Sequence, residues 1–359
     1  MVVVEHLLNE VSASAKIKDR DFGLIGPVFI GIAIEYWNMR IEFLQAGSGD
    51  SIWICHNKKN IVIDGGKTSS AIIKRYNKLL QDECIDLLVV THIDSDHIAG
   101  IIALVELLKT RGETDRLKQV WFNYPKKEDT GEYSVNEGNS LSDSLCKIEG
   151  LNWCNNTSGL INKGKVVGDI KLSVLAPDHD VANEYIPKTP EELGARKDDW
   201  NINLNSLIAN VDDDDIDESG PNSQSIVILV QYEDKKILLP GDCTPKELYV
   251  ALQTYNSIHG TPLELDLMKL PHHGSKRNIT RDLFSEIKCK KFVISTNVNK
   301  KYCFPHKESI AKIICYREKM DEMVEVFFNY QESMDILGIS DEEQNIHKIK
   351  LEASNEFYF

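Results

Sequence analysis

The sequence predicts an α/β protein, because short apolar runs of strand length alternate with segments whose apolar residues recur at helical spacing. Residues 85–97 (IDLLVVTHIDSDH) are the clearest example. A strand expected to be buried runs directly into a polar cluster, and residues 98–110 continue as a helix. Polar side chains that follow buried strands are where α/β proteins place their chemistry. The 359 residues, 42% of them hydrophobic, suffice for a full core.

Composition narrows the possible functions. The chain has 41 Lys plus Arg and 56 Asp plus Glu, a net charge of −15, which disfavours binding of nucleic acid by bulk electrostatics. Its 8 cysteines form no C-x-x-C pair, which is typical of reduced thiols. The first residues lack signal-peptide features, and the apolar stretch at 23–37 is interrupted by Gly and Pro and is shorter than the roughly 20 residues of a membrane-spanning helix. We therefore expect a cytoplasmic protein without membrane contact.

The first half of the chain is expected to alternate strands and helices. Two strands with a Gly-rich turn are predicted over residues 39–66, followed by a helix at 71–81. Beyond the polar cluster, strands are predicted at 120–124 and 170–178, and the polar residues 127–139 are expected to form a loop.

The second half begins with a polar insertion at residues 179–221, which contains the acidic run DDDDIDES. We expect a solvated loop there, with a lid or a partner-binding segment as the alternative. Four strands and a helix are predicted after it, so both halves contain strands that end in polar residues. These strands cover residues 225–232, 235–243, 265–275 and 291–297, and the helix covers residues 246–255.

The cluster from His92 to His97 places two imidazoles and two carboxylates, Asp94 and Asp96, within six positions. Apolar segments on both sides hold this turn against the core. Its groups would be left unsatisfied, or with like charges adjacent, unless a cation lay among them. A polar surface loop is the alternative. Mixed nitrogen and oxygen ligands fit zinc, and the high share of carboxylates also admits manganese.

Two further strand ends carry potential ligands. Asp242 follows a predicted buried strand in LLPGDC, and His272 and His273 follow another in MKLPHHGS. Together with the first cluster, they predict one site assembled from several loops. His306, in the tripeptide FPH, is either another wall of this site or an exposed loop residue.

Seven short motifs occur in order along the chain: GSGDS, IDGG, THIDSDHIAG, NSQS, LPGD, PHHGS and FPH. In these motifs the sequence resembles the metallo-β-lactamase fold superfamily, and within it the branch related to the soluble domain of ComEC, the competence DNA-uptake protein. The resemblance implies a four-layer αββα sandwich with two mixed β-sheets over residues 39–314. Residues 1–38 would be an N-terminal arm outside it, and residues 315–359 a C-terminal extension that packs on the domain.

The resemblance also implies two divalent metal ions, with zinc as the foremost candidate and manganese as the alternative. The implied metal ligands are His92, Asp94, Asp96, His97, Asp242 and His273. His92 and Asp94 would face one ion, and Asp96 and His97 would face the second. Asp242 would bridge both ions, and His273 would complete the second site. His272 would lie beside the metals, free to position substrate or to protonate a leaving group, with His306 as the alternative proton donor. Asp96 would orient the attacking water as well as bind metal, so His272 and Asp96 are the candidate catalytic residues.

The chain departs from the common family pattern at two positions. Asp94 stands where most members carry a second histidine, and Asn222 stands where a third metal-binding histidine is usual. Both departures also resemble the ComEC branch. They make the first metal site poor in imidazole, which weakens zinc there or favours manganese. Candidate substrate contacts beside the motifs, including a lysine that could attract phosphate or simply be solvated, are Asn222, Ser225, Lys276 and His306.

Hydrolysis is the expected reaction, because two neighbouring cations lower the pKa of a bridging water to about 7 and clamp a tetrahedral or phosphoryl centre. The first hypothesis is a phosphodiesterase or nuclease, with a phosphoester or single-stranded nucleic acid as substrate. The second is a hydrolase of a small phosphoester, thioester or lactone. The third is a regulatory or binding subunit with an inactive site, whose protein partner would bind the acidic insertion or the C-terminal tail.

Overall fold

The computed structural model describes residues 38–124, 133–161, 163–178, 197–260 and 262–359. The chain divides into two compact units, Met1–Asn38 and Met39–Phe359, and the second unit carries all the elements below. The N-terminal arm predicted at 1–38, with its apolar stretch at 23–37, lies outside the described residues except for its last one. In the part of the chain that is described, no helix has the length and apolar character needed to cross a bilayer.

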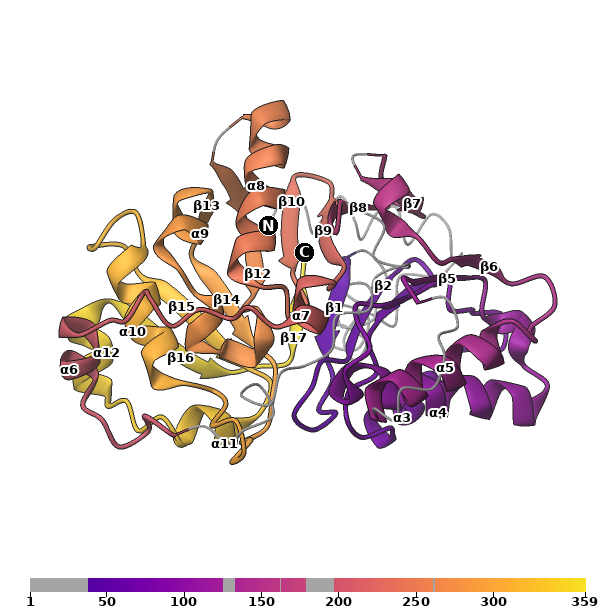
Figure 1. The fold of residues 1–359 in the computed structure, drawn as a ribbon, viewed down its shortest axis with the longest axis horizontal. Helices are drawn as coiled ribbons and strands as arrows, with labels where there is room; N and C mark the ends of the chain where they lie inside the picture. The colour runs from indigo at the N-terminus through magenta and orange to yellow at the C-terminus, as the bar shows by residue number, and fades with distance from the viewer. Residues whose placement is uncertain (1–37, 125–132, 162, 179–196, 261) are drawn as a thin grey trace, which may run out of the picture. The chain divides into compact units, whose positions relative to one another are not determined.

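The first sheet of the second unit is mixed, with seven strands in the order β17-β1-β2-β3-β4-β5-β6 (Figure 1). Strands β1 to β3 are joined antiparallel, and β3 to β6 run parallel. Its strands are β1 (Arg40–Phe43), β2 (Ile52–His56), β3 (Lys59–Ile63), β4 (Leu87–Val90), β5 (Gln119–Phe122), β6 (Asn152–Cys154) and β17 (Glu356–Tyr358).

The second sheet is also mixed, with eight strands in the order β16-β15-β14-β12-β10-β9-β8-β7. Strands β7 to β10 pair antiparallel, and the pairs from β10 to β16 are parallel. Its strands are β7 (Lys165–Val167), β8 (Ile170–Ala176), β9 (Val227–Tyr232), β10 (Lys235–Leu239), β12 (Leu267–Lys269), β14 (Lys291–Ile294), β15 (Val324–Phe328) and β16 (Ile349–Ala353). A separate parallel pair is formed by β11 (Leu263–Leu265) and β13 (Ile287–Cys289).

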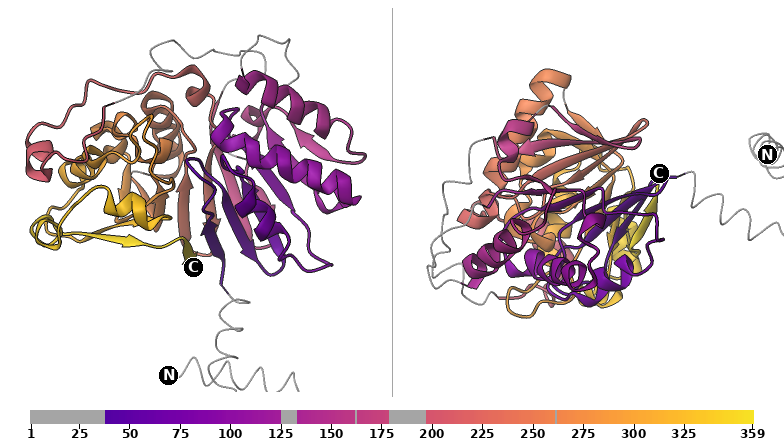
Figure 2. Two further views of the ribbon diagram at one scale, coloured as in Figure 1. Left: turned by 90° about the horizontal axis from the view of Figure 1, so that it is seen from below. Right: turned by 90° about the vertical axis from the view of Figure 1, so that its right-hand side faces the viewer.

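Three hydrophobic cores separate four layers, as the predicted αββα sandwich requires (Figure 2). Strand β4 illustrates the packing, since Leu87 and Val89 face the core between the sheets, whereas Leu88 and Val90 face the outer helices. This burial on both faces explains its continuous apolar run. The outer helices are α3 (Ser70–Tyr76), α4 (Ser95–Arg111) and α5 (Tyr133–Leu145) on the first sheet, and α8 (Pro245–His259), α9 (Arg281–Ser285) and α10 (Lys307–Tyr316) on the second.

Two segments differ from the simplest expectation. The loop predicted at residues 127–139 was wrong in its second part, because α5 begins at Tyr133, and Val135, Leu141 and Leu145 bury their side chains in the outer core. Residues 315–359 do more than cover the domain. They supply β15 and β16 to the second sheet and β17 to the first, with the short helices α11 (Gln331–Asp335) and α12 (Asp341–His347) between them.

Candidate metal centre

The polar cluster occupies the turn between β4 and α4, as the sequence predicts. His92 follows β4 directly, Asp94 is the N-cap residue of α4, and Asp96 and His97 lie in the first helical turn. Glycines in neighbouring loops allow this turn to pack closely. A Cβ atom on Gly49 would lie 1.6 Å from the carbonyl oxygen of Asp96, so only glycine fits there.

Four imidazoles converge on one carboxylate oxygen at the edge where β4, β10 and β12 end. The Oδ2 atom of Asp242 lies 3.1 Å from Nε2 of His273, 3.2 Å from Nε2 of His97, 3.8 Å from Nε2 of His272 and 4.0 Å from Nε2 of His92. Two more predicted ligands lie against this group. Asp94 Oδ2 is 3.7 Å from His92 Nε2, and Asp96 Oδ2 is 3.5 Å from His273 Nε2.

In the three histidines predicted as ligands, the ring nitrogen that faces away from Asp242 is Nδ1, and an oxygen atom lies within hydrogen-bond distance of it. Nδ1 of His97 lies 2.7 Å from Asp64 Oδ2, Nδ1 of His273 lies 3.1 Å from the carbonyl of Ser295, and Nδ1 of His92 lies 3.0 Å from Thr91 Oγ1. The Thr91 hydroxyl donates its own proton to Asp64, so it accepts from His92. With Nδ1 thus protonated, each ring in its neutral form has its lone pair on Nε2, the atom that faces Asp242, which is the arrangement found around protein-bound metals.

Sequence reasoning missed three residues that support this centre. Asp64 holds His97, and Asp50 Oδ1 lies 3.6 Å from His273 Nδ1. The third is Lys269, whose fully buried ammonium contacts Asp50, donates to the carbonyl of Gly241 at 3.0 Å, and lies 3.5 Å from Asp242 Oδ1. The signals were present, since both aspartates lie in quoted motifs and Lys269 is a charged residue inside an apolar strand.

The charges of the centre raise the pKa values of its histidines and lower that of Asp242, and in each case they outweigh the opposing effect of burial. Burial disfavours the imidazolium form, yet the carboxylates of Asp242 and Asp50 outweigh it and raise the pKa of His273 to about 9. The same balance, with Asp242 and Asp64, raises the pKa of His97 well above its usual value. For Asp242, burial alone would raise the pKa, but His273, His97, His272 and Lys269 hold it well below the usual range. In the absence of a cation, protons on the histidines balance the buried carboxylate.

The donor set fits divalent cations. Asp50, His97, Asp242 and His273 are all buried, and one ligand atom from each lies within 4.8 Å of the others. Among the described residues, the buried His92 Nε2 and Asp242 Oδ1 have no hydrogen-bond partner, a state that is costly for polar atoms unless another group satisfies them. The chain therefore contains a buried His/Asp cluster of metal-ligand character. How many ions it binds, and which, stays a prediction.

The backbone around the centre is strained where it presents these side chains. His272 and His273 have φ values of 49° and 57°, and Asp64 has a φ of 58°, all in the left-handed region that disfavours residues with a Cβ atom. Such conformations cost roughly 1–3 kcal/mol each and occur mainly at functional sites, where the surrounding contacts enforce them.

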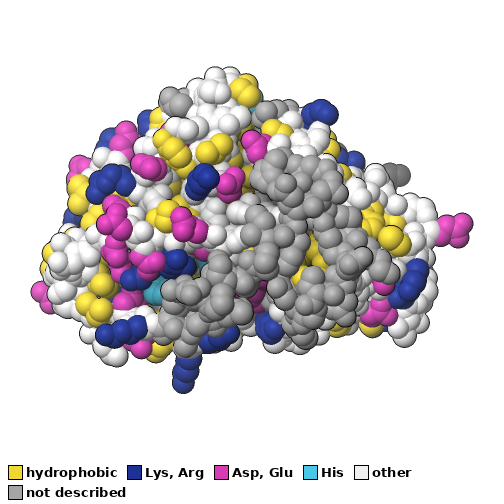
Figure 3. All heavy atoms as spheres, in the orientation of Figure 1, with side chains coloured by type: hydrophobic (Ala, Val, Ile, Leu, Met, Phe, Trp, Pro, Cys, Tyr) yellow, Lys and Arg dark blue, Asp and Glu magenta, His cyan; other side chains and the backbone are white. Residues whose placement is uncertain are grey.

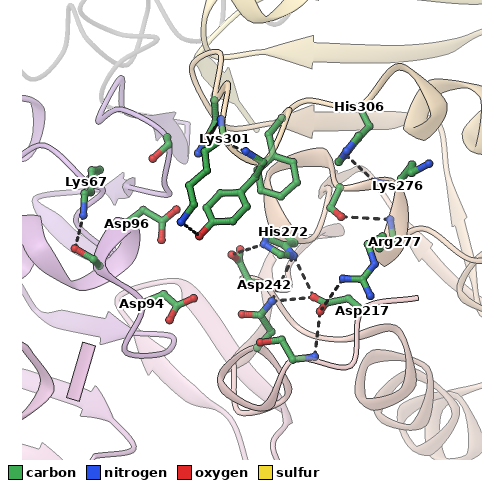
Figure 4. Close-up of a pocket in the computed structure, with 18 of the residues that line it drawn as sticks. Lys67, Asp94, Asp96, Asp217, Asp242, His272, Lys276, Arg277, Lys301 and His306 are labelled. Carbon is green, nitrogen blue, oxygen red and sulfur yellow. Dashed lines mark hydrogen bonds and ion pairs between the residues drawn. The ribbon is translucent and has the colours of Figure 1, made fainter. Parts of the chain in front are cut away.

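A cleft of about 600 Å³ opens onto the centre, with Asp94, Asp96, Asp242 and His272 among its lining residues (Figure 4). Lys67 lines it from the side of the first sheet. Lys301, Tyr302 and Phe304 line it from the loop after β14, where the two aromatic rings stack with centroids 6.0 Å apart.

The predicted substrate contacts are placed unevenly around this cleft. Lys276 lines it, but its ammonium pairs with Glu308 at 2.8 Å. His306 lines it as well, and its Nδ1 faces the backbone N–H of Lys276 at 3.4 Å. Asn222 also lines it and donates to Asp217 at 2.8 Å. Ser225 is fully buried and is not among the lining residues in the described part of the chain.

Comparison with known proteins identifies the family. Residues 44–296 match the sequence profile of the metallo-beta-lactamase superfamily. The chain belongs to this superfamily. Recombination protein 2 of Haemophilus influenzae is 28% identical over 100 residues, which are 28% of this chain and 12% of that protein. The match confirms the predicted relationship to the ComEC-like branch as a distant one, and the chain spans far less than two thirds of that relative.

Solved structures of other members resemble this one at low sequence identity. The metallo-beta-lactamase fold protein YhfI from Bacillus subtilis gives a TM-score of 0.41 at 9% identity, over 90% of this chain and 100% of that chain. Zinc-bound PqqB from Methylobacterium extorquens gives a TM-score of 0.43 at 11% identity, over 89% of this chain and 99% of that chain.

Proposed function

We propose that this superfamily member is a metal-dependent hydrolase that cleaves phosphodiesters, with single-stranded nucleic acid as the polymeric form of the substrate. The observation that carries the proposal is the convergence of four imidazole Nε2 atoms on Asp242 Oδ2 at the base of an open cleft. Two divalent cations, zinc or manganese, would supply an activated water and charge stabilisation there.

The residues around the two proposed cation positions would have different roles. His92 and Asp94 would hold one cation, and Asp96, His97 and His273 the other, with Asp242 between them. Asp96 is the ligand with substantial solvent exposure, 26% of its side chain, so it is placed to orient a water as well as to bind. His272 lies on the cleft wall, with its Nε2 atom 3.8 Å from Asp242 Oδ2 and therefore beside the proposed cation positions.

The cleft walls support a phosphodiester with a planar group attached. The ammonium groups of Lys67 and Lys301 lie on two sides of the cleft, where they donate to the hydroxyls of Ser95 at 2.6 Å and Tyr302 at 2.8 Å. The stacked rings of Tyr302 and Phe304 offer a surface for a base. The face of the molecule drawn in Figure 3 adds little positive charge beyond these lysines. On the face drawn in Figure 3, lysine and arginine side chains lie among acidic ones rather than in a broad basic area.

A second candidate is the hydrolysis of a small phosphoester, thioester or lactone. The observation in its favour is that two cations beside the centre are already committed to carboxylates, Lys276 to Glu308 and Arg277 to Asp215 at 2.7 Å. Fewer cations then remain for a long phosphate backbone than for one compact group within the cleft. The inactive regulatory subunit has no comparable observation in its favour, because the ligand-type residues are intact and brought together.

One preparation tests these candidates. Purified protein is analysed for bound metal and assayed with bis(nitrophenyl) phosphate and with single-stranded DNA in the presence of zinc or manganese. Asp96→Ala serves as the inactive control. Bound metal with cleavage of both substrates, lost in Asp96→Ala, is the expected result. Bound metal without diester cleavage would favour the small-substrate hydrolase, and no bound metal under any loading condition would reject both enzymes.

A further inference from the structure

The acidic insertion packs one carboxylate, that of Asp217, against His272 beside the buried His/Asp cluster. Its described part, residues 197–221, is continued by the end of α7, and we call residues 197–223 the strap. The strap crosses the second half of the domain from α6 (Leu204–Ala209) to α7 (Gly220–Ser223) (Figure 1). At its start, Asp199 accepts hydrogen bonds from the first backbone N–H groups of α10, those of Lys307 at 2.9 Å and Glu308 at 2.8 Å. The strap is thus anchored to the domain, although residues 212–214 are exposed as expected of a solvated acidic run.

The last aspartate of this run behaves differently from the others. Asp217 is only 2% exposed, and its Oδ2 atom accepts from Asn222 at 2.8 Å and from Asn278 at 2.9 Å. Its Oδ1 atom accepts from the backbone N–H of Ser219 at 3.1 Å. Burial would raise the pKa of this carboxyl, but the donors around it, His272 first among them, hold the pKa below its usual range. Three N–H donors, from Asn222, Asn278 and Ser219, face its two oxygens, and this is the environment of an ionised acceptor.

This carboxylate fixes the proton on the His272 ring. Nδ1 of His272 lies 3.1 Å from Asp217 Oδ2 and 3.2 Å from Asn278 Oδ1. The orientation of the Asn278 amide is itself settled, because its nitrogen donates to Asp217 and to the carbonyl of Cys243. The amide nitrogen of Asn222 also lies 3.4 Å from Nδ1, but it donates to Asp217 at the shorter distance of 2.8 Å. The two nearer neighbours of Nδ1 are thus acceptors, so Nδ1 carries a proton. In the neutral ring the lone pair is then on Nε2.

That lone pair is directed at the metal centre. Figure 4 shows His272 between Asp217 and Asp242, with Nε2 3.8 Å from Asp242 Oδ2. Two strained residues in succession, His272 and His273, are what bring both neighbouring imidazoles to this one carboxylate. The cation position proposed at His92 and Asp94 otherwise has one imidazole, because Asn222 stands where a further histidine is usual in the family. The amide nitrogen of Asn222 is directed toward Asp217.

We infer that Asp217 is a positioning residue, which holds His272 with Nδ1 protonated so that Nε2 is an additional ligand for a cation bound at Asp242. The strap is then part of the metal centre. This inference rests on the metal binding proposed above, but not on a phosphodiester as the substrate. The inference predicts that His272 and Asp217, which are not among the six implied ligands, determine how many ions the protein retains. Asp217 would do so without contacting a metal ion.

The first experiment measures metal stoichiometry and affinity for manganese and zinc in the full-length protein. His272→Ala and Asp217→Ala are expected to lose one of two ions, or to bind it roughly 10–100-fold more weakly, as is typical when an outer hydrogen-bond partner of a ligand is removed. Asp217→Asn keeps an acceptor oxygen and should restore most of the affinity. Glu218→Ala, which removes the exposed neighbouring acid, should match the wild type.

The second experiment reads the His272 ring itself. Nitrogen-15 NMR of the metal-free protein, at a pH where the ring is neutral, should find His272 protonated at Nδ1 in the wild type and at Nε2, or as a mixture of the two tautomers, in Asp217→Ala. A general loss of stability would not move this signal selectively. Two ions bound with unchanged affinity in His272→Ala would overturn the ligand role alone. A wild-type chain that binds no metal would overturn it together with the proposed function.

Discussion

The Nε2 atoms of His97 and His273 lie 3.2 Å apart, and both are within 3.2 Å of the same oxygen of Asp242. Two lone pairs directed at each other repel, so this geometry is stable only if something positive lies between or on the rings. In the metal-free protein that role falls to protons, as the raised pKa values of both histidines indicate. Protons and the metal ions of the proposed function would therefore compete for the same atoms.

The stability of the metal-free protein should fall as the pH rises. The folded-state pKa of His273, about 9, exceeds the ordinary value of 6.5, so this stabilisation is complete below 6.5 and lost as the pH approaches 9. Each proton that only the folded state retains changes the unfolding free energy by about 1.4 kcal/mol per pH unit. Urea denaturation at several pH values between 6.5 and about 9 measures this change in the free energy of unfolding. Stability that rises across this window would contradict the assignment.

Metal affinity should rise over the same pH range, because each ion displaces protons from His97 and His273. Calorimetric titration in buffers of different ionisation enthalpy should detect proton release on binding, diminishing toward the pKa of about 9. Saturating metal should also reverse the loss of stability at high pH. Binding without proton release would mean that the rings are already neutral in the metal-free state.

Asp64→Asn should weaken metal binding although Asp64 is not among the implied ligands. Its carboxylate accepts from His97 Nδ1 and from both the N–H and the hydroxyl of Thr91, so it fixes two neighbouring residues of the motif at once. We expect a loss of roughly 10–100-fold in affinity, measured by competition with a metal indicator. Asp82→Asn, which removes an exposed partner of Lys58, is the matched control. Equal affinity in both variants would show that His97 needs no such support.

The sequence could predict this centre in part because strand ends are local features. The continuous apolar run of β4 and the dense polar turn after it indicate both a buried strand and a cation, and the histidines after β12 follow the same pattern. The partners of these residues come from distant parts of the chain. Asp217 and His272 are 55 positions apart, and an acidic run gives no sign of which of its members turns inward. Only the tertiary structure distinguishes Asp217 from the exposed aspartates beside it.

Helix α5 was missed for a related reason. Its sequence, YSVNEGNSLSDSL, is rich in polar residues and contains a glycine, which argues against a helix by propensity. Tertiary packing outweighs that preference. Gly138 lies so close to the ring of Tyr124 that a Cβ atom would be 2.6 Å from it, and the apolar residues of α5 complete the core outside the first sheet. The residue that lowers local helix propensity is the one that permits the contact.

Lys67→Ala and Lys301→Ala should raise KM for a diester substrate and leave kcat nearly unchanged, because both side chains line the cleft without belonging to the metal centre. A partly exposed charged contact contributes about 0.5–1.5 kcal/mol to binding, so its loss should raise KM roughly two- to tenfold. Each variant should also weaken the salt dependence of KM for single-stranded DNA. Lys300→Ala removes an exposed neighbour that is not among the lining residues of the described chain. An equal effect of Lys300→Ala would indicate non-specific attraction.

Lys269→Met should destabilise the metal-free protein strongly, because it leaves Asp50 buried without its cation beside the carboxylate of Asp242. Removing one partner of a buried ion pair costs about 3–5 kcal/mol in unfolding free energy, whereas removing both often costs far less. The double variant with Asp50→Asn should therefore be more stable than Lys269→Met alone, as urea denaturation would measure. Lys235→Met, which breaks an exposed pair with Asp266, should change little. If the single variant is as stable as the wild type, Lys269 does not balance the charge of Asp50, and the buried carboxylates must share a proton instead.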